Sequence, residues 1–279
     1  MILRPNNSQV GIYRKRFYMR TILVINSKGG AGKTTLTTNL ASYYASQNMR
    51  TAILDCDPQG SSLHWLRQRP SRDIHGASAA PANGAAPLNS IRAWVPEQTE
   101  VLIIDAPAGV KGLILKDLVR RSNFILIPVN PSPIDIHATA DFVKDLYLVG
   151  GVRNSKAQVA VLANRVRNSS PVLESLERFL NALKLPFLTR ISDSDQYVKA
   201  VEMGLGVFEM DEAATLAERQ ELLPIFRWLD GHAHVNQRAD VSDKVVSIEK
   251  TGKFGSLSAT GKTVISSLFT ATGRFKRNI

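Results

Sequence analysis

Short, continuous apolar runs separated by longer amphipathic stretches dominate residues 21–230. Apolar runs without polar alternation are typical of strands that are covered on both faces, as in parallel sheets. Five segments have this character: 21–26, 51–56, 101–105, 124–129 and 158–164. We expect each of them to form a strand of one parallel sheet.

The intervening stretches have helical periodicity. Leu36, Leu40 and Tyr44 lie four residues apart, and the apolar residues between Val172 and Leu183 recur at spacings of three and four. Helices of this kind pack one face on a sheet and connect parallel strands by crossovers. The pattern therefore predicts a doubly wound, mostly parallel α/β sheet with helices on both faces. Residues 70–90, rich in Ala, Pro and Gly, are expected to form a surface loop.

Charge is distributed unevenly along the 279 residues, whose formal net charge is +11. Residues 1–20 contain five Arg or Lys and no acid, and residues 231–279 contain eight against three acids. We therefore expect a basic N-terminal extension (1–20), an α/β domain (21–230) and a basic, flexible tail (231–279). Basic ends favour a polyanion such as nucleic acid or an anionic membrane, although solvated tails without a partner are an equal alternative.

Several protein classes are disfavoured by composition. The single cysteine, Cys56, cannot form an intramolecular disulfide. No segment reaches the roughly 18 apolar residues that a membrane-spanning helix needs, and the N-terminus lacks the apolar core of a secretory signal. The expectation is a cytoplasmic protein.

The segment VINSKGGAGKTT, residues 24–35, follows the first predicted strand and precedes a predicted helix. Glycines in this context let backbone N–H groups surround phosphates at the start of the helix. In this motif the lysine, here Lys33, neutralises β- and γ-phosphate charge, and the next hydroxyl, here Thr34, contacts Mg²⁺. The usual pattern G-x-x-x-x-G-K-[ST] fails at Ser27, and Lys28 is an additional lysine. The residues expected to bind the nucleotide phosphates are Gly29, Gly30, Ala31, Gly32, Lys33, Thr34 and Thr35.

Acidic residues end two other predicted strands. Asp105 ends the strand 101–105, where an unpaired buried carboxylate would be costly, so a role near a metal explains it better than packing. Asp55 and Asp57 flank Cys56 at the end of the strand 51–56. Strand alternation places both carboxylates on one face, where they either serve the site or cap a helix or turn.

Three motifs carry a resemblance to a known family: K-G-G-x-G-K-T-T with its extra lysine, D-x-D-P-Q-G at 55–60 and D-x-P at 105–107. Over roughly residues 20–230 the chain resembles the deviant Walker A ATPases of the ParA/MinD family. The resemblance implies a P-loop NTPase-type fold that binds ATP and Mg²⁺. It also implies a homodimer that encloses two ATP molecules, in which Lys28 reaches the phosphates of the partner subunit, as an arginine finger does.

The same resemblance assigns roles to residues outside the loop. It implies that Asp57 positions the attacking water, that Thr34, Asp57 and Asp105 serve the metal, and that Asn164 in LANRV contacts adenine. Lys28, Lys33 and Asp57 are then the catalytic residues. Relatives carry DNA-contacting basic residues in the C-terminal third. The corresponding candidates are Arg190, Lys199 and Arg219.

The implied function is a partitioning or positioning ATPase, bacterial and nucleoid-associated. Its ATP-bound dimer would bind DNA non-specifically, and a ParB-like or other cargo-adaptor protein would stimulate hydrolysis. The alternative is a MinD-like ATPase that attaches to a membrane through the basic amphipathic segment 260–279. A reductase of the nitrogenase iron-protein type is excluded because Cys56 alone cannot supply its cluster ligands. The cargo and the partner protein are not specified by the sequence.

Overall fold

The computed structural model describes residues 19–79, 94–167, 171–182 and 184–232. Contacts divide the chain into two units, Met1–Asp230 and Gly231–Ile279. The predicted basic extension and basic tail lie almost entirely outside the described residues, so the domain limits stay a prediction. The description below concerns the first unit.

A seven-stranded sheet with the order β3-β2-β4-β1-β5-β6-β7 forms the centre of the fold. Every strand pairs with its neighbours in parallel. All five predicted strands are present, and the predicted doubly wound, parallel α/β fold is confirmed. The strands are β1 (Arg20–Val24), β2 (Thr51–Asp55), β3 (Ile74–Ser78), β4 (Val101–Asp105), β5 (Phe124–Val129), β6 (Gln158–Val166) and β7 (Phe187–Ser192).

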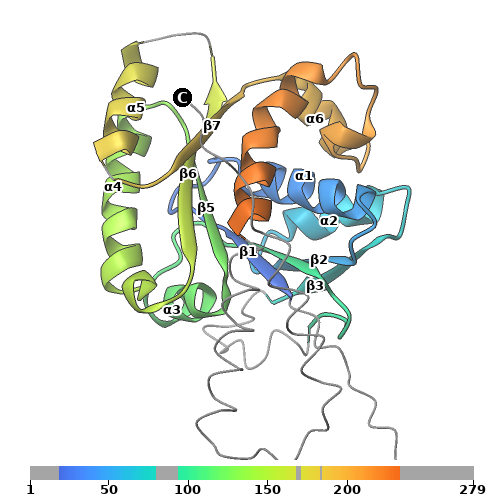
Figure 1. Ribbon diagram of the computed structural model, residues 1–279, viewed down its shortest axis with the longest axis horizontal. Coiled ribbons are helices and arrows are strands. Elements are labelled where there is room, and N and C mark those ends of the chain that lie inside the picture. The colour runs from blue at the N-terminus through green and yellow to red at the C-terminus, as the bar shows by residue number, and fades with distance from the viewer. Residues whose placement is uncertain (1–18, 80–93, 168–170, 183, 233–279) are drawn as a thin grey trace, which may run out of the picture. The chain divides into compact units, whose positions relative to one another are not determined.

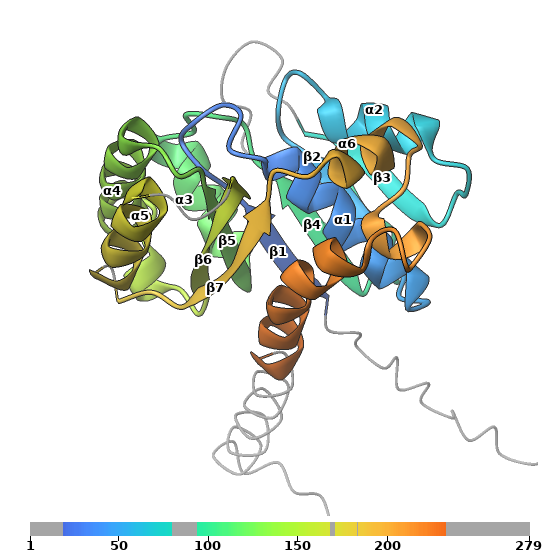
Figure 2. The same cartoon turned by 90° about the horizontal axis from the view of Figure 1, so that it is seen from above.

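Helices cover both faces of the sheet (Figures 1 and 2). One face holds α1 (Lys33–Ser46), α2 (Ser61–Gln68) and α6 (Asp195–Glu202). The other face holds α3 (Gly112–Arg121), α4 (Pro133–Leu148) and α5 (Pro171–Ala182). Two short 3₁₀ turns, η2 (Val152–Asn154) and η3 (Val207–Glu209), and a helical run over 216–232 complete the described part.

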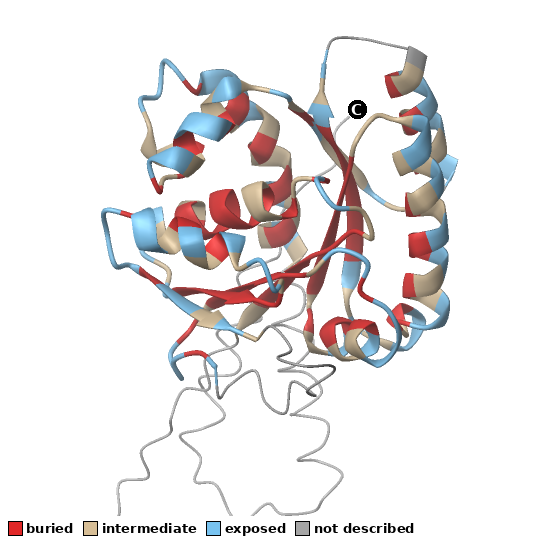
Figure 3. Cartoon of the chain, turned by 180° about the vertical axis from the view of Figure 1, so that it is seen from behind, coloured by how far each residue is buried: buried red, intermediate tan, exposed pale blue. Residues whose placement is uncertain are grey.

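The central strands are buried along their whole length, as Figure 3 shows by its red strands. Every residue of β2, β4 and β5 is buried. This double coverage explains why the sequence shows apolar runs there and not an alternation of apolar and polar residues. The parallel pairing places the carboxyl ends of β1, β2, β4, β5 and β6 at one edge, which is where ligands bind in sheets of this type.

The structure corrects part of the expectation that residues 70–90 are a surface loop, because Ile74–Ser78 form the edge strand β3, while residues 80–90 lie outside the described residues. This strand pairs with β2 alone and only Ile74 is buried. Its close packing depends on Gly76, where an added Cβ would lie 2.5 Å from Cδ1 of Leu66 on α2. A short strand made by pairing and by close packing of a helix leaves no hydrophobic pattern in the sequence.

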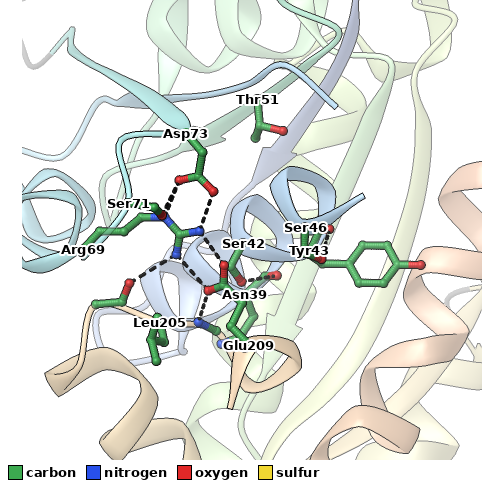
Figure 4. Close-up of polar contacts among 12 residues, drawn as sticks. Asn39, Ser42, Tyr43, Ser46, Thr51, Arg69, Ser71, Asp73, Leu205 and Glu209 are labelled. Carbon is green, nitrogen blue, oxygen red and sulfur yellow. Dashed lines mark hydrogen bonds and ion pairs between the residues drawn. The ribbon is translucent and has the colours of Figure 1, made fainter. Parts of the chain in front are cut away.

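A buried arginine joins the end of α2 to the segment before the helical run 216–232 (Figure 4). The guanidinium of Arg69 donates to Asp73 at 2.8 and 2.9 Å and to the carbonyl of Gly204 at 3.2 Å. It also donates to Glu209, with Nη1 2.8 Å from Oε2. The Arg69 side chain is 1% exposed. This network, which the sequence did not reveal, fixes η3 against the α2 side of the sheet.

Candidate functional site

The glycine-rich loop connects β1 to α1 at the carboxyl edge of the sheet. Gly30 and Gly32 have φ values of +74° and +87°, a region that side chains other than glycine rarely adopt. Gly32 is the N-cap of α1, and no side chain caps that helix. The first backbone N–H groups of α1 therefore lack a side-chain acceptor, an arrangement that suits a bound phosphate.

Asparagine side chains from three strand ends brace this loop. Asn26 after β1 accepts from the backbone N–H of Lys28 in the loop at 3.2 Å and donates to the carbonyl of Pro128 in β5 at 2.6 Å. Asn130 after β5 and Asn164 in β6 donate to the loop itself, at the carbonyl oxygens of Gly30 (3.3 Å) and Ala31 (2.9 Å). Only Asn164 was predicted as a site residue. The available signal for the other two was a polar amide directly after a buried strand.

The two lysines of the loop differ in environment. Lys33 is buried, and its Nζ donates to the carbonyl of Lys28 at 3.1 Å. Burial lowers the pKa of Lys33, and the nearby carboxylates of Asp105 and Asp57 oppose that shift. Lys28 is half-buried, and its ammonium makes no hydrogen bond or ion pair with the residues that the structure describes. Lys33 is thus directed into the loop, whereas the Lys28 charge has no partner in the ranges that the structure describes.

Asp105 at the end of β4 carries the features expected of a metal-site carboxylate. Its Oδ2 accepts from Thr34 Oγ1 at 2.9 Å, whereas its buried Oδ1 has no hydrogen-bond partner in the described part of the chain. Burial raises the pKa of Asp105 to about 7, the hydrogen bond from Thr34 opposes this, and the nearby Asp55 charge adds to it. A dication would satisfy the orphaned oxygen and favour the ionised form.

Thr34 and Asp105 thus fit Mg²⁺, which proteins usually hold through one or two oxygen side chains together with substrate phosphates and water. Within the described ranges, no group of three or more His, Cys, Asp or Glu side chains is arranged around a metal position.

Asp55 and Asp57, which only Cys56 separates, make different contacts. Asp55 is fully buried, and its Oδ2 accepts from the backbone N–H of Ser62 (3.1 Å) and Leu63 (3.2 Å) and from the Ser62 hydroxyl (2.7 Å) at the start of α2. The capping alternative is therefore confirmed for Asp55. Asp57 is half-buried and begins the turn that precedes α2, and among the described residues its carboxylate accepts only from Gln59 N, at 3.0 Å. Its second carboxylate oxygen faces no partner among the described residues.

A cleft of about 220 Å³ opens beside the loop. Its walls include Thr35 of α1, Asn164 and Arg165 of β6, Ser192 of β7, and Tyr197 of α6. Pockets for whole drug-sized ligands usually exceed about 300 Å³, so this cleft suits one ring system. The structure thus places Asn164 both at the phosphate loop and in the wall of an adjoining cleft.

The basic residues predicted to contact DNA lie on different elements. Arg190 on β7 is exposed and pairs with Glu177, and Lys199 is exposed on α6. Arg219 is half-buried, and its Nε and Nη2 donate to the carbonyl oxygens of Val207 (3.3 Å) and Met210 (2.8 Å). These bonds hold Arg219 in the fold. Arg190 and Lys199 remain the accessible members of the predicted set.

The proposed membrane segment 260–279 lies outside the described residues. Among the helices that are described, none is both long enough and apolar enough to cross a bilayer.

Comparisons with known proteins agree with this geometry. One similar protein is the maintenance of carboxysome distribution protein A of Halothiobacillus neapolitanus, which is 28% identical over 193 residues, covering 68% of this chain and 87% of that protein. Another is the chromosome-partitioning ATPase Soj of Thermus thermophilus, 29% identical over 45% of this chain and 52% of Soj.

Solved structures show the same fold. A putative plasmid partition protein of Borrelia burgdorferi bound to AMPPNP has a TM-score of 0.60 and 14% identity, covering 75% of this chain and 99% of that one. The MinC:MinD cell division complex of Aquifex aeolicus has a TM-score of 0.57 and 18% identity, covering 76% of this chain and 96% of that one.

The family model for the CobQ/CobB/MinD/ParA nucleotide binding domain matches residues 22–207, which include the glycine-rich loop, Asp57, Asp105 and Asn164. The sequence resemblance is therefore confirmed, and this chain belongs to the CobQ/CobB/MinD/ParA family of nucleotide-binding proteins.

Proposed function

We propose that this protein is a ParA-like ATPase whose two subunits enclose two Mg²⁺–ATP molecules and bind DNA as a dimer. A partner protein stimulates ATP hydrolysis, which releases the protein from the DNA. The observation that most supports this proposal is the different placement of the two loop lysines. Lys33 is buried in its own loop, whereas the Lys28 ammonium has no partner among the described residues. A cation in this position can neutralise the phosphates of a facing subunit.

The proposed chemistry uses few groups. Lys33, the N–H groups of residues 29–35 and the start of α1 hold the phosphates, and Thr34 and Asp105 hold Mg²⁺, assisted by Asp57. When bound, Mg²⁺ would neutralise phosphate charge. Asp57, with one carboxylate oxygen uncommitted, orients the attacking water. Lys28 of the facing subunit neutralises charge on the γ-phosphate, which makes turnover depend on the dimer.

The amide orientation of Asn164 favours adenine. Its Nδ2 is committed to the carbonyl of Ala31, so Oδ1 is the atom left to face the cleft. Oδ1 is an acceptor, which matches the amino group of adenine and opposes the carbonyl oxygen of guanine. ATP is therefore proposed over GTP.

A complementation experiment tests the role of Lys28. Lys28→Ala should bind ATP nearly as well as wild type but should lose the rise in specific ATPase rate with protein concentration, whereas Lys33→Ala should lose ATP binding. Lys156→Ala is the matched control, because this exposed lysine precedes β6 at the opposite edge of the sheet.

Mixing Lys28→Ala with Asp57→Ala separates a trans role from a cis role. If Lys28 acts in trans, each mixed dimer has one site with its own Asp57 and the partner's Lys28, and an equal mixture recovers about a quarter of the wild-type rate. If Lys28 acts in cis, no site in the mixture is intact. Absence of recovery, with both variants shown to dimerise in AMPPNP, would refute the proposal.

The surface on which the protein acts is a second part of the proposal. Relatives are named for carboxysome distribution and chromosome partitioning, and we propose that this chain likewise positions a DNA molecule or a protein compartment. The accessible Arg190 and Lys199 and the basic ends support contact with DNA. Such binding should weaken steeply as the salt concentration rises.

Co-sedimentation with DNA and with anionic liposomes, each with ATP and with ADP, tests which surface the protein binds. Liposome binding that requires residues 260–279 would instead support membrane attachment.

A further inference from the structure

The carboxyl end of β6 is irregular next to the candidate site. Ala163 pairs with Arg190 and Val166 pairs with Ser192, and the register shifts between them. Asn164 and Arg165 together therefore oppose one residue of β7, which is a β-bulge. Bulges are frequent beside active sites, where they redirect a side chain.

Backbone strain accompanies this bulge. Arg165 has a φ of +54°, a value uncommon for residues other than glycine and found for two other non-glycine residues in the described part of the chain, Asn48 and Lys184. Unlike those two, Arg165 lies within a strand, at the edge where the site residues meet. Strain retained at such a position points to a role for the side chain that it places.

The two bulge residues, Asn164 and Arg165, border the same site. Asn164 is buried under the glycine-rich loop, while Arg165 is exposed and lines the 220 Å³ cleft. The Arg165 guanidinium makes no hydrogen bond or ion pair with any residue that the structure describes. Its neighbours differ in this respect, because Arg167 donates to Asp193 at 2.6 Å and Arg190 pairs with Glu177.

The cleft wall contributed by α6 is mostly aromatic and aliphatic, with the carboxylate-bearing Glu202 at its end. Tyr197, Val198 and Val201 line it. The Tyr197 hydroxyl donates to Glu221 Oε2 at 3.1 Å, which anchors this wall to the helical run 216–232. A flat ring in the cleft would contact these side chains on one face and leave the other face to Arg165. A guanidinium is planar and stacks on aromatic rings more readily than an ammonium does.

We propose that Arg165 stacks its guanidinium on the base of the bound nucleotide and so closes the cleft that Asn164 and α6 form. This inference rests on the proposed nucleotide site and adds a base-contacting residue to it. The ligand group recognised is a planar heteroaromatic base and not a phosphate.

The test compares two probes on the full-length chain by calorimetry in the presence of Mg²⁺. ATP has a base, whereas inorganic tripolyphosphate has the phosphates alone. Arg165→Ala should raise the dissociation constant for ATP by between about twofold and thirtyfold and leave that for tripolyphosphate unchanged. Arg165→Lys should also bind ATP more weakly than wild type. Arg178→Ala, an exposed arginine of α5 bonded to Ser175, is the matched control.

Three results would overturn the inference: normal ATP affinity in Arg165→Ala, an equal loss for tripolyphosphate, or full affinity in Arg165→Lys, which would indicate charge and not stacking. Arg165→Asn guards against misfolding, because asparagine tolerates a positive φ, and it should show the same selective loss. If only the inference about Arg165 is wrong, the wild-type protein still binds both ATP and tripolyphosphate. If the wild-type protein binds neither probe, the proposed nucleotide site fails, and this inference fails with it.

Discussion

A Cβ atom on Gly32 would lie 2.0 Å from Nδ2 of Asn164. The last residue of the glycine-rich loop and a residue near the carboxyl end of β6 are thus in direct contact, although 132 positions separate them in the sequence. The contact leaves no room for a side chain at Gly32, whose φ of +87° already favours glycine. The same approach directs the Asn164 amide to the carbonyl of Ala31.

Gly32→Ala should therefore displace the loop from Asn164 and lower the affinity for ATP by more than about tenfold. Gly29→Ala is the comparison, because nothing lies within 4 Å of a Cβ placed there and its φ is not positive. Fluorescence titration with a labelled ATP analogue measures both. Equal affinities in the two variants would contradict the steric argument.

Asp55 and Asp57 should give opposite phenotypes on substitution. Asp55→Ala removes the acceptor of four donors, three of them at the start of α2 and the fourth the backbone N–H of Asp57 at 3.0 Å. Because these donors would be left unpaired in a buried place, we expect a loss of about 2 kcal/mol or more in the free energy of unfolding. Urea denaturation measures it.

Asp57→Ala should leave the free energy of unfolding within about 0.5 kcal/mol of wild type, because Asp57 is half-buried and its carboxylate accepts one local hydrogen bond, from Gln59 N. The hydrolysis rate at saturating ATP should fall to background. A stable Asp55→Ala protein, or an active Asp57→Ala protein, would contradict the division of roles.

Arg69→Met should destabilise the protein strongly. The Arg69 side chain is 1% exposed, and its removal leaves the 15%-exposed Glu209 carboxylate without its cation. Breaking a buried ion pair in this way costs about 3 kcal/mol or more. Arg120→Ala is the control, since that side chain is 72% exposed in its pair with Asp117 and should cost less than about 1 kcal/mol. Similar losses in the free energy of unfolding of the two variants would show that burial does not determine how much an ion pair stabilises this fold.

The pH dependence of this network follows from Asp73. The hydrogen bond from Arg69 lowers the pKa of Asp73 to about 2, from 3.8 in an ordinary environment. Because the folded-state pKa is the lower one, the stabilisation is present above about pH 4 and is lost as the pH falls through 2. The carboxyl group is 40% exposed, so its contribution should be below about 1 kcal/mol.

Urea unfolding of wild type and Asp73→Asn between pH 6 and pH 2 checks this. The difference in free energy of unfolding should shrink toward zero at the acid end. A constant difference across the range would show that Asp73 acts through packing and not through its charge.

The sequence determined the strands, because double burial makes each central strand a continuous apolar run, as in β4 and β5. It likewise indicated the phosphate loop and the acidic strand ends, since glycines, lysine and aspartate are chemically distinctive at those spacings. The family assignment followed from these motifs. The edge strand β3 was missed because its conformation depends on pairing with β2 and on the space that Gly76 leaves for Leu66.

Only the tertiary structure decided which of several chemically similar residues serves which purpose. Strand alternation places Asp55 and Asp57 on one face without distinguishing them, yet the start of α2 takes up the Asp55 carboxylate and leaves Asp57 half-buried. Arg69, Arg165 and Arg219 are likewise three arginines that the fold places in different surroundings, beside carboxylates, in a cleft wall and beside backbone carbonyls respectively. A local pattern encodes burial and backbone conformation, whereas hydrogen-bond partners are distant in the chain and are set when the sheet assembles.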